Sequence, residues 1–402
     1  MNPNPDNTGF PSDRSRELAE RVEHFVRSVV VPYEQDPRCG AHGPTPELVA
    51  EMRAKAREAG VMTPHILPDG SHLTQRETAV VLRCSGLSPL GPVAVNTMAP
   101  DEGNMFLLGK IGTPWQKERF LEPLVRGEAR SAFFMTEPAG EQGAGSDPSM
   151  LRTTAVRDGS QWRIDGRKMF ITGAEGASVG IVMARTSGPD DTTARATMFL
   201  VDLPHPAVRI ERLIDTIDSS MPGGHAQVLI DGLRVSEEQV LGAVDEGFRY
   251  AQVRLSPARL SHCMRWLGSA TRAHEIATAY ATTRKSFGKL LIDHEGVGFM
   301  LADNLIELQQ AQLMIDWCAG VLDAGSQATV ESSMAKVAVS EALFRIADRC
   351  VQVMGGLGVS RDTIVEQVFR ETRAFRVYDG PTEVHKWSLA RKIKRDALAG
   401  KG

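Results

Sequence analysis

Apolar residues recur at three- and four-residue steps near the start of the chain, and this is the period of an amphipathic helix. The apolar residues of the opening segment are Leu18, Val22, Phe25 and Val29. Thr45 followed by Pro46 is typical of a helix start, and Thr113 followed by Pro114 has the same form. We therefore expect a helical domain over residues 1–129, in which the polar residues 1–13 form a disordered tail.

The hydrophobic period changes near Arg130, where short apolar or alternating runs begin. Runs such as SAFFMTEP, VGIVMAR and TMFLVDL are separated by DGS, SGPDD and PGG, which favour turns. Because no helical segments lie between the runs, the pattern predicts a small antiparallel sheet rather than a parallel one. We assign residues 130–241 to this β domain.

The helical period returns after Gly242 and continues almost to the end of the chain. One predicted helix begins near residue 295, and its apolar stripe carries Val297, Leu301, Leu305 and Leu308. Another long helix is predicted over residues 330–356, where Gly355 and Gly356 supply the flexible residues that end helices. Residues 242–402 are therefore expected to form a helical bundle, which makes the fold class α+β.

The composition is that of an ordinary globular protein, with 42% hydrophobic and 24% charged residues among 402. This length predicts two or three packed domains. The net charge of -4 offers no basic field for a nucleic acid or an anionic membrane, so an anionic ligand would need local arginines. The polar N-terminus argues against a signal peptide, and no apolar run is long enough to span a bilayer.

The five cysteines are scattered and form neither a CxxC pair nor a metal-ligand cluster. We expect reduced, mostly packed thiols in a cytoplasmic protein, with no metal site. The cysteines are Cys39, Cys84, Cys263, Cys318 and Cys350.

A glycine-rich run from Met135 to Asp147 is the first candidate site. Its glycines allow backbone N–H groups to approach a ligand closely, and Thr136 and Ser146 add hydroxyl groups. An ordinary surface loop would have the same composition. A phosphate-binding P-loop is excluded, because no GK[ST] follows.

Two further candidates carry an aromatic or a cationic side chain. Phe170, in the run from Trp162 to Gly173, lies near a threonine and a glycine and could line the edge of a flat ring system, or pack in the core. Arg284, at the end of a predicted helix, could bind a pyrophosphate or cap helix carbonyls.

The last candidates lie near the C-terminus. The run from Gln352 to Gly358 looks like a dinucleotide fingerprint, but it follows a helix instead of a strand, which excludes the Rossmann interpretation. Asp379 lies in a short turn between two predicted helices, where a solvated turn or cap aspartate is the alternative.

The order of these motifs in a helix–sheet–helix chain resembles the acyl-CoA dehydrogenase family over nearly the whole sequence. The matching pieces are TEP…GAGSD, W-x-I-x-G-x-K-x-F-I-T, R-x-x-F-G, QVMGG-x-G and YDG. APDEGNM at 99–105 and HCMRWLG at 262–268 resemble the branch of family members ten and eleven. The resemblance implies an N-terminal helical domain, a middle antiparallel β domain and a C-terminal four-helix bundle.

The resemblance also implies FAD as the cofactor, bound between the middle domain and the bundle. The implied flavin contacts of the middle domain are Phe133, Thr136, Ser146, Phe170, Ile171 and Thr172. Those of the bundle are Arg284, Phe287, Gln352, Val353, Gly355 and Gly356. Because Arg284 and Phe287 would reach across a subunit interface, a homodimer or homotetramer is expected.

The implied reaction is oxidation of an acyl-CoA thioester to the trans-2-enoyl-CoA. A base removes the α-proton while the flavin N5 accepts the β-hydride, and a dry pocket makes a carboxylate a better base. Asp379 stands at the family's base position, where glutamate is usual, whereas the alternative base position is Ala258 here. The implied substrate contacts are Ser146, Arg259, Tyr378 and Gly380.

An electron-transferring flavoprotein is the expected electron acceptor. One alternative is an acyl-CoA oxidase, which passes electrons to oxygen. Another is a non-catalytic member that only binds FAD or acyl-CoA, since aspartate is one methylene shorter than glutamate.

The chain departs from the family pattern in three more places. The glycine-rich loop has additional residues at Ala139–Gln142, and Phe170 replaces a common tryptophan, which keeps ring stacking without the indole N–H. Glu295 replaces a usual glutamine, and a carboxylate there would repel a FAD phosphate if it pointed inward.

Overall fold

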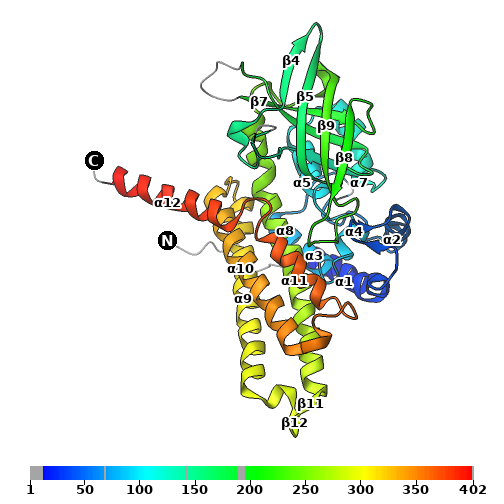
Figure 1. Cartoon of the computed structure of the whole chain (residues 1–402), viewed down its shortest axis with the longest axis vertical. Helices are drawn as coiled ribbons and strands as arrows, with labels where there is room; N and C mark the ends of the chain where they lie inside the picture. Colours follow the sequence, from blue (N-terminus) through cyan, green and yellow to red (C-terminus); the bar gives the residue numbers. More distant parts are fainter. Residues whose placement is uncertain (1–11, 68, 141–142, 189–194, 401–402) are drawn as a thin grey trace. The chain divides into compact units, whose positions relative to one another are not determined.

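The computed structural model describes residues 12–67, 69–140, 143–188 and 195–400 (Figure 1). The chain divides into two compact units, and each is described by itself. The helical unit comprises Met1–Gln35, Glu58–Val95 and Arg259–Gly402. The sheet unit comprises Asp36–Arg57 and Asn96–Ala258. These units do not follow the expected domain boundaries at residues 129 and 241, which remain a prediction.

The helical unit is built mainly from helices. Its helices are α1 (Asp13–Phe25), α3 (Gln75–Ser85), α4 (Gly91–Ala94), α9 (Glu295–Asp323), α10 (Thr329–Met354), α11 (Val365–Phe375) and α12 (Thr382–Ala399). Helix α8 (Gly247–Thr283) begins in the sheet unit and continues into the helical unit, with Pro257 inside it. The short strands β11 (Lys285–Ser286) and β12 (Lys289–Leu290) form a hairpin between α8 and α9.

Local capping explains where several helices begin and end. The Ser12 side chain accepts a hydrogen bond from the Ser15 backbone, so α1 begins at Asp13. Of the tail expected over residues 1–13, residues 1–11 lie outside the described residues. Thr74 and Glu77 cap α3 reciprocally. Helix α10 ends as predicted, because Gly355 adopts a φ of 57°, a conformation that is unfavourable for most other residues.

Two glycines allow α3 and α8 to pack with their backbones in close approach. A Cβ atom at Gly86 would lie 1.9 Å from the Arg265 carbonyl oxygen, and one at Gly268 would lie 2.1 Å from that of Arg83. Any larger residue at either position would force the helices apart.

Helix α9 corrects one sequence prediction. Its buried positions are Leu301, Asn304, Ala311, Ile315, Cys318 and Ala319. Leu305, which we placed on the same stripe as Leu301, is 63% exposed. A helix with apolar residues on more than one face does not reveal from its sequence which face packs within its own chain.

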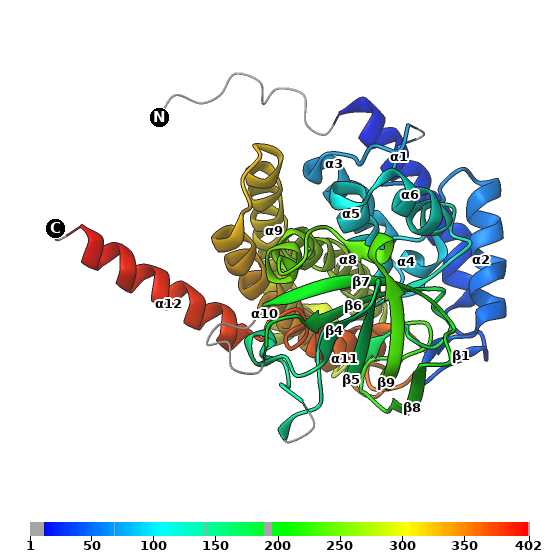
Figure 2. The same cartoon turned by 90° about the horizontal axis from the view of Figure 1, so that it is seen from above.

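The sheet unit contains an eight-stranded sheet, and strands β4 to β9 of it are labelled in Figure 2. Its strands are β3 (Ser131–Phe134), β4 (Thr154–Asp158), β5 (Gln161–Thr172), β6 (Val179–Arg185), β7 (Ala196–Asp202), β8 (Val208–Ile214), β9 (His225–Ser236) and β10 (Val240–Leu241). The other elements are α2 (Pro46–Glu58), α5 (Asp101–Ile111), α6 (Pro114–Gln116), α7 (Glu122–Val125), β1 (Cys39–Gly40) and β2 (Gly43–Pro44). Helices α2 and α6 begin at the predicted prolines.

The sheet order is β10-β7-β6-β4-β5-β9-β8, with β3 also paired to β6. Most neighbours are antiparallel as predicted, but β3 pairs with β6 in parallel, and so does β4 through Thr154 and Arg185. Side chains of β6 alternate between two cores, because successive residues of a strand face opposite sides. Ile181 and Met183 pack with residues of α5 and α8, whereas Val182 and Ala184 pack against β5 and β9 residues.

The five cysteines all lie among the described residues and form no disulfide; Cys39 is partly buried and the other four are buried. Among the helices of the described residues, none is both long enough and apolar enough to cross a membrane.

Candidate active site

Asp379 lies in a tight turn between α11 and α12 of the helical unit. Its backbone has a φ of 53°, which is uncommon for a residue with a side chain. The Arg259 Nε donates to the Asp379 carbonyl oxygen at 3.1 Å, and the His385 Nε2 lies 3.2 Å from the same oxygen. Next to it, Gly380 has a φ of 100°, and a Cβ there would lie 2.6 Å from His385 Nε2. The turn therefore requires glycine at position 380 and is anchored through the Asp379 carbonyl.

The Asp379 carboxylate is paired with an imidazole. His262 Nε2 lies 3.3 Å from Asp379 Oδ2, and the two side chains are 5% and 22% exposed. The His262 ring packs against Phe375 and Tyr378, with ring centroids 5.8 and 4.9 Å away. The Tyr378 hydroxyl in turn accepts a hydrogen bond from Trp266 Nε1 at 2.5 Å. Aromatic side chains thus pack around the imidazole that is paired with the base candidate.

Cationic side chains also surround this turn. Lys336 Nζ donates to the Phe375 carbonyl at 2.5 Å, and burial lowers the pKa of Lys336 to about 8, although Cys263 and Asp379 oppose the shift. Burial also lowers the pKa of Arg259, against the attraction of Asp379. For His385, burial and the Arg259 charge bring the pKa down to about 4, so its imidazole is neutral at pH 7. A partly buried carboxylate with positive neighbours is suited to act as an ionised general base.

Phe170 and Thr172 lie near the end of β5 in the sheet unit. Phe170 has a φ of 57° and is 52% exposed, and the register of β5 against β9 is shifted between Lys168 and Ile171. This irregularity turns an aromatic ring toward solvent, while Ile171 stays in the core. The Phe170 ring is therefore accessible to a flat ring system, as the predicted contact requires.

The Thr172 hydroxyl belongs to a short chain of hydrogen bonds. Its Oγ1 lies 2.9 Å from His225 Nδ1, and His225 Nε2 lies 2.8 Å from Asp218 Oδ2. Hydrogen bonding to His225 helps lower the pKa of Asp218, although burial opposes this effect. The imidazole therefore fixes the position of the hydroxyl.

The Glu137 side chain forms hydrogen bonds with the backbone of the glycine-rich loop and of the residues that follow it. This buried carboxylate accepts hydrogen bonds from the backbone N–H groups of Ala144, Arg152 and Thr153. Thr136 is half-buried and Ser146 exposed at the two ends of this loop. Of the additional residues at Ala139–Gln142, Glu141 and Gln142 lie outside the described residues.

Phe133 of β3 is half-buried beneath a guanidinium group. The Arg254 Cζ lies 4.1 Å from the centre of the Phe133 ring, and Arg254 Nε donates to Asn104 Oδ1 at 2.8 Å. This stacking orients the ring within the sheet unit.

The remaining cofactor candidates belong to the helical unit. Arg284 and Phe287 lie at the β11–β12 hairpin, where Phe287 is 95% exposed with a φ of 49°. Gln352 is exposed at the end of α10, whereas Val353 is buried. Glu295 is exposed at the first residue of α9. The cofactor candidates thus fall into two sets, one in each unit, and their joint contact with one cofactor remains a prediction.

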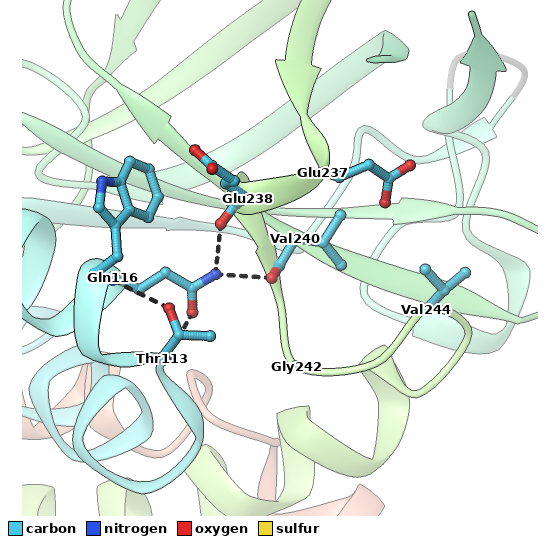
Figure 3. Close-up of a pocket in the computed structure, with 8 residues that line it drawn as sticks. Thr113, Gln116, Glu237, Glu238, Val240, Gly242 and Val244 are labelled. Carbon is cyan, nitrogen blue, oxygen red and sulfur yellow. Dashed lines mark hydrogen bonds between the residues drawn. The ribbon is translucent and has the colours of Figure 1, made fainter. Parts of the chain in front are cut away.

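A separate cavity of about 470 Å³ lies in the sheet unit (Figure 3). It is lined by Thr113, Trp115, Gln116, Glu237, Glu238, Val240, Gly242 and Val244. Gln116 Nε2 donates to the carbonyls of Glu238 and Val240, so it joins α6 to the sheet edge. None of the predicted site residues lines this cavity, and we assign no chemistry to it.

Family comparisons agree with this fold and this arrangement of motifs. The model of the acyl-CoA dehydrogenase N-terminal domain matches residues 12–128, that of the middle domain residues 132–221, and that of the C-terminal domain residues 245–394. The chain belongs to the acyl-CoA dehydrogenase family, which is a family of oxidoreductases.

Several curated proteins are similar over most of this chain. Acyl-CoA dehydrogenase family member 11 of Gallus gallus is 33% identical over 95% of this chain and 51% of its own length. FadE2 of Mycobacterium tuberculosis, assigned as an acyl-CoA dehydrogenase, is 35% identical over 86% and 85%. The (R)-benzylsuccinyl-CoA dehydrogenase of Thauera aromatica is 37% identical over 75% and 73%. The chain spans about half the length of the family-member-11 relatives that it matches.

Solved structures share the fold. A Mycobacterium abscessus protein assigned to the acyl-CoA dehydrogenases superposes with a TM-score of 0.87 at 34% identity, over 96% of this chain and 99% of that one. A glutaryl-CoA dehydrogenase of Mycobacterium smegmatis in complex with FADH2 has a TM-score of 0.82 at 24% identity, over 95% and 94%. At that lower identity the likeness concerns the fold alone.

Several side chains of these sites were not assigned a role from the sequence, among them Arg254, His225 and His262. His262 was noticed only as part of the HCMRWLG run. The signal that could have found it is its spacing from Arg259, because residues three apart share one face of a helix.

Proposed function

We propose that this chain catalyses FAD-dependent α,β-dehydrogenation of an acyl-CoA thioester, with Asp379 as the base that removes the α-proton. The observation that carries this proposal is the Asp379 turn. Its backbone is anchored by Arg259 and His385, and its carboxylate is only 22% exposed and interacts electrostatically with Arg259 and Lys336. The product would be the trans-2-enoyl-CoA, as in a β-oxidation step.

The residues present suit a flavin. Phe170 offers an exposed ring near the fixed hydroxyl of Thr172. A Cβ atom at Gly355 or Gly356 would meet no atom within 4 Å, so the backbone there is open to a ligand. Arg284 is an exposed cation suited to a diphosphate. When bound, FAD would supply the acceptor for the β-hydride.

The chain itself would provide the proton acceptor and its surroundings. The α-carbon of a bound thioester would lose its proton to the Asp379 carboxylate, and FAD, when bound, would take the hydride from the β-carbon. Asp379 is one methylene shorter than glutamate, and a misplacement of ~1 Å can reduce a rate by about a hundredfold. The anchored turn limits such a misplacement. Contacts of Ser146, Arg259, Tyr378 and Gly380 with the substrate are part of this proposal, although Arg259 Nε already donates to the Asp379 carbonyl.

Anaerobic titration of the flavin tests the proposal. We expect an acyl-CoA of suitable chain length to bleach the flavin band of the purified protein. Asp379→Asn should retain FAD but lose the bleaching, because an amide cannot accept the proton. If Asp379→Asn is reduced at the rate of the unchanged protein, Asp379 is not the base. A protein that cannot be loaded with FAD would contradict the whole proposal.

An electron-transferring flavoprotein is the proposed electron acceptor. The same reduced protein distinguishes this acceptor from oxygen. Rapid reoxidation by air with consumption of one oxygen per product would identify an acyl-CoA oxidase instead. Bound flavin that no acyl-CoA reduces would identify a non-catalytic binding protein.

A homodimer or homotetramer is also part of the proposal. Helix α9 exposes an apolar surface, and the 95% exposed Phe287 is suited to contact a second copy. The large exposed apolar side chains of α9 are Phe299, Leu305, Ile306, Leu313 and Trp317. A cytoplasmic location is proposed from the five cysteines, which form no disulfide in the described part of the chain, since reducing compartments keep thiols from forming disulfides.

A further inference from the structure

Helix α8 presents two side chains to the Asp379 turn. Arg259 and His262 are three residues apart, so they share one face of the helix. Arg259 donates to the backbone carbonyl of Asp379, and His262 Nε2 lies 3.3 Å from the carboxylate oxygen Oδ2. One helix face therefore contacts both the backbone and the side chain of the proposed base.

The orientation of the His262 ring is set by its surroundings. The side chain is buried, and its ring packs against both Phe375 and Tyr378. Trp266 donates a hydrogen bond to the Tyr378 hydroxyl, and Lys336 donates one to the Phe375 carbonyl. An imidazole restrained in this way has few other positions, so its contact with Asp379 follows from the packing.

We propose that His262 is a positioning residue for the reaction, which fixes the rotation of the Asp379 carboxylate by donating a hydrogen bond from Nε2 to Oδ2. This inference rests on the proposed function of Asp379. The turn backbone is already anchored, so the torsions about Cα–Cβ and Cβ–Cγ are the freedom that remains to this carboxylate. His262 restricts these torsions. During proton transfer His262 keeps its proton, and the α-proton moves from the substrate carbon to Asp379.

Other charged or titratable groups also face this pair. They are Arg259 on α8, Lys336 on α10, His385 on α12 and the neighbouring Tyr378. Arg259 and His385 approach the carbonyl of Asp379, and Lys336 approaches the carbonyl of Phe375. His262 Nε2 approaches the Asp379 carboxylate itself.

Two substitutions separate a hydrogen-bonding role from a packing role. His262→Phe keeps an aromatic ring against Phe375 and Tyr378 but has no donor. His262→Gln loses the ring but keeps an N–H donor. Positioning predicts that the limiting rate of flavin reduction at saturating acyl-CoA falls by about ten- to a hundredfold in the Phe variant. The Gln variant should stay within about threefold of the unchanged protein, and acyl-CoA affinity should change little in both.

The pH profile gives an independent readout. Loss of a donor to a carboxylate raises its proton affinity, so the ascending limb of the reduction rate should move to higher pH in His262→Phe. It should not move in His262→Gln or in the control His274→Gln, which removes a histidine elsewhere on α8. Equal rates and equal pH profiles in the Phe and Gln variants would overturn the inference. If the Phe variant does not retain FAD, His262→Leu replaces it in the same comparison.

Asp379→Asn distinguishes failure of the positioning role of His262 from failure of the proposed function. If Asp379→Asn abolishes reduction while both His262 variants match the unchanged protein, only the positioning role fails. If Asp379→Asn is reduced normally, the proposed function fails, and the positioning role fails with it.

Discussion

Lys168 and Glu137 form a buried ion pair that joins two of the sequence motifs. Lys168 Nζ lies 3.1 Å from Glu137 Oε1, and the side chains are 0% and 1% exposed. Lys168 also donates to the carbonyls of Met135 and Met183, at 3.1 and 2.8 Å. Lys168, the lysine of the W-x-I-x-G-x-K motif, thus forms an ion pair with Glu137, the glutamate of the TEP motif. Glu137 in turn accepts a hydrogen bond from the backbone of the glycine-rich loop.

Removing one partner of this pair should be strongly destabilising. Lys168→Met leaves an uncompensated buried carboxylate, so the free energy of unfolding should fall by about 3–5 kcal/mol. The double variant with Glu137→Gln should lose less than the sum of the two single variants. Urea unfolding of the three variants measures this, and strictly additive losses would show that the pair is not coupled.

Gly86→Ala should disrupt the packing of α3 against α8. The added Cβ would lie 1.9 Å from the Arg265 carbonyl oxygen, and overpacking of this kind costs about 1–3 kcal/mol or more. The matched control is Gly109→Ala in α5, where the new Cβ meets no atom within 4 Å. Helix propensity predicts that this control is stabilised by about 0.5–1 kcal/mol. Thermal unfolding of both variants should give shifts of opposite sign.

His65 predicts acid sensitivity of the fold. Its ring is fully buried, and neither nitrogen has a hydrogen-bond partner among the described residues. Burial, and then the charges of His72 and Arg265, lower the pKa of His65 well below its usual value of 6.5. The unfolded chain therefore binds this proton first as the pH falls. The contribution of neutral His65 to the free energy of unfolding is therefore complete above about pH 6.5. Below that pH it decreases by at most ~1.4 kcal/mol per pH unit.

The measurement is the free energy of unfolding between pH 8 and pH 5, in the unchanged protein and in His65→Phe. The variant should show a flatter dependence below pH 6.5, whatever its stability at pH 8. An unchanged slope would mean that His65 does not control the acid response.

The hydrogen bond between Thr172 and His225 should contribute to flavin binding. If the hydroxyl contacts the flavin, His225→Phe frees it to rotate, and FAD affinity should fall by about threefold to tenfold, the value of one net hydrogen bond. Thr172→Val should lower the affinity at least as much, and adding His225→Phe to it should have little further effect. FAD titration of the apoprotein checks this cycle, and additive losses would show that the two residues act independently.

The apolar surface of α9 should be needed for assembly. Ile306→Asp places a charge on a side chain that is 55% exposed, so folding of the subunit should be retained while the oligomer dissociates. Gln310→Asp adds a charge at an exposed polar position of the same helix and serves as the control. Sedimentation or light scattering measures the mass. A monomeric parent protein, or equal masses in all three, would refute this role of α9.

The sequence by itself determined the order of the elements and several of their ends. Thr45, Thr113 and Gly355 act locally, through side-chain caps or a positive φ, so their effects can be predicted without distant contacts. The change of hydrophobic period near Arg130 likewise located the sheet strands, because alternation is a property of each strand alone. Asp379 could be singled out from its place among the family motifs.

Only the tertiary structure decided what depends on residues far apart in the chain. Leu305 and Leu301 both suit an apolar face, and only the packing of α9 shows that Leu301 is buried and Leu305 exposed. The parallel pairing of β3 with β6 depends on which strands become neighbours in the sheet, and hydrophobic periodicity does not encode strand order. His262 lies more than a hundred residues before Asp379 and meets it because α8 packs against the turn after α11. The chain order contains both residues, but only folding places the imidazole beside the carboxylate.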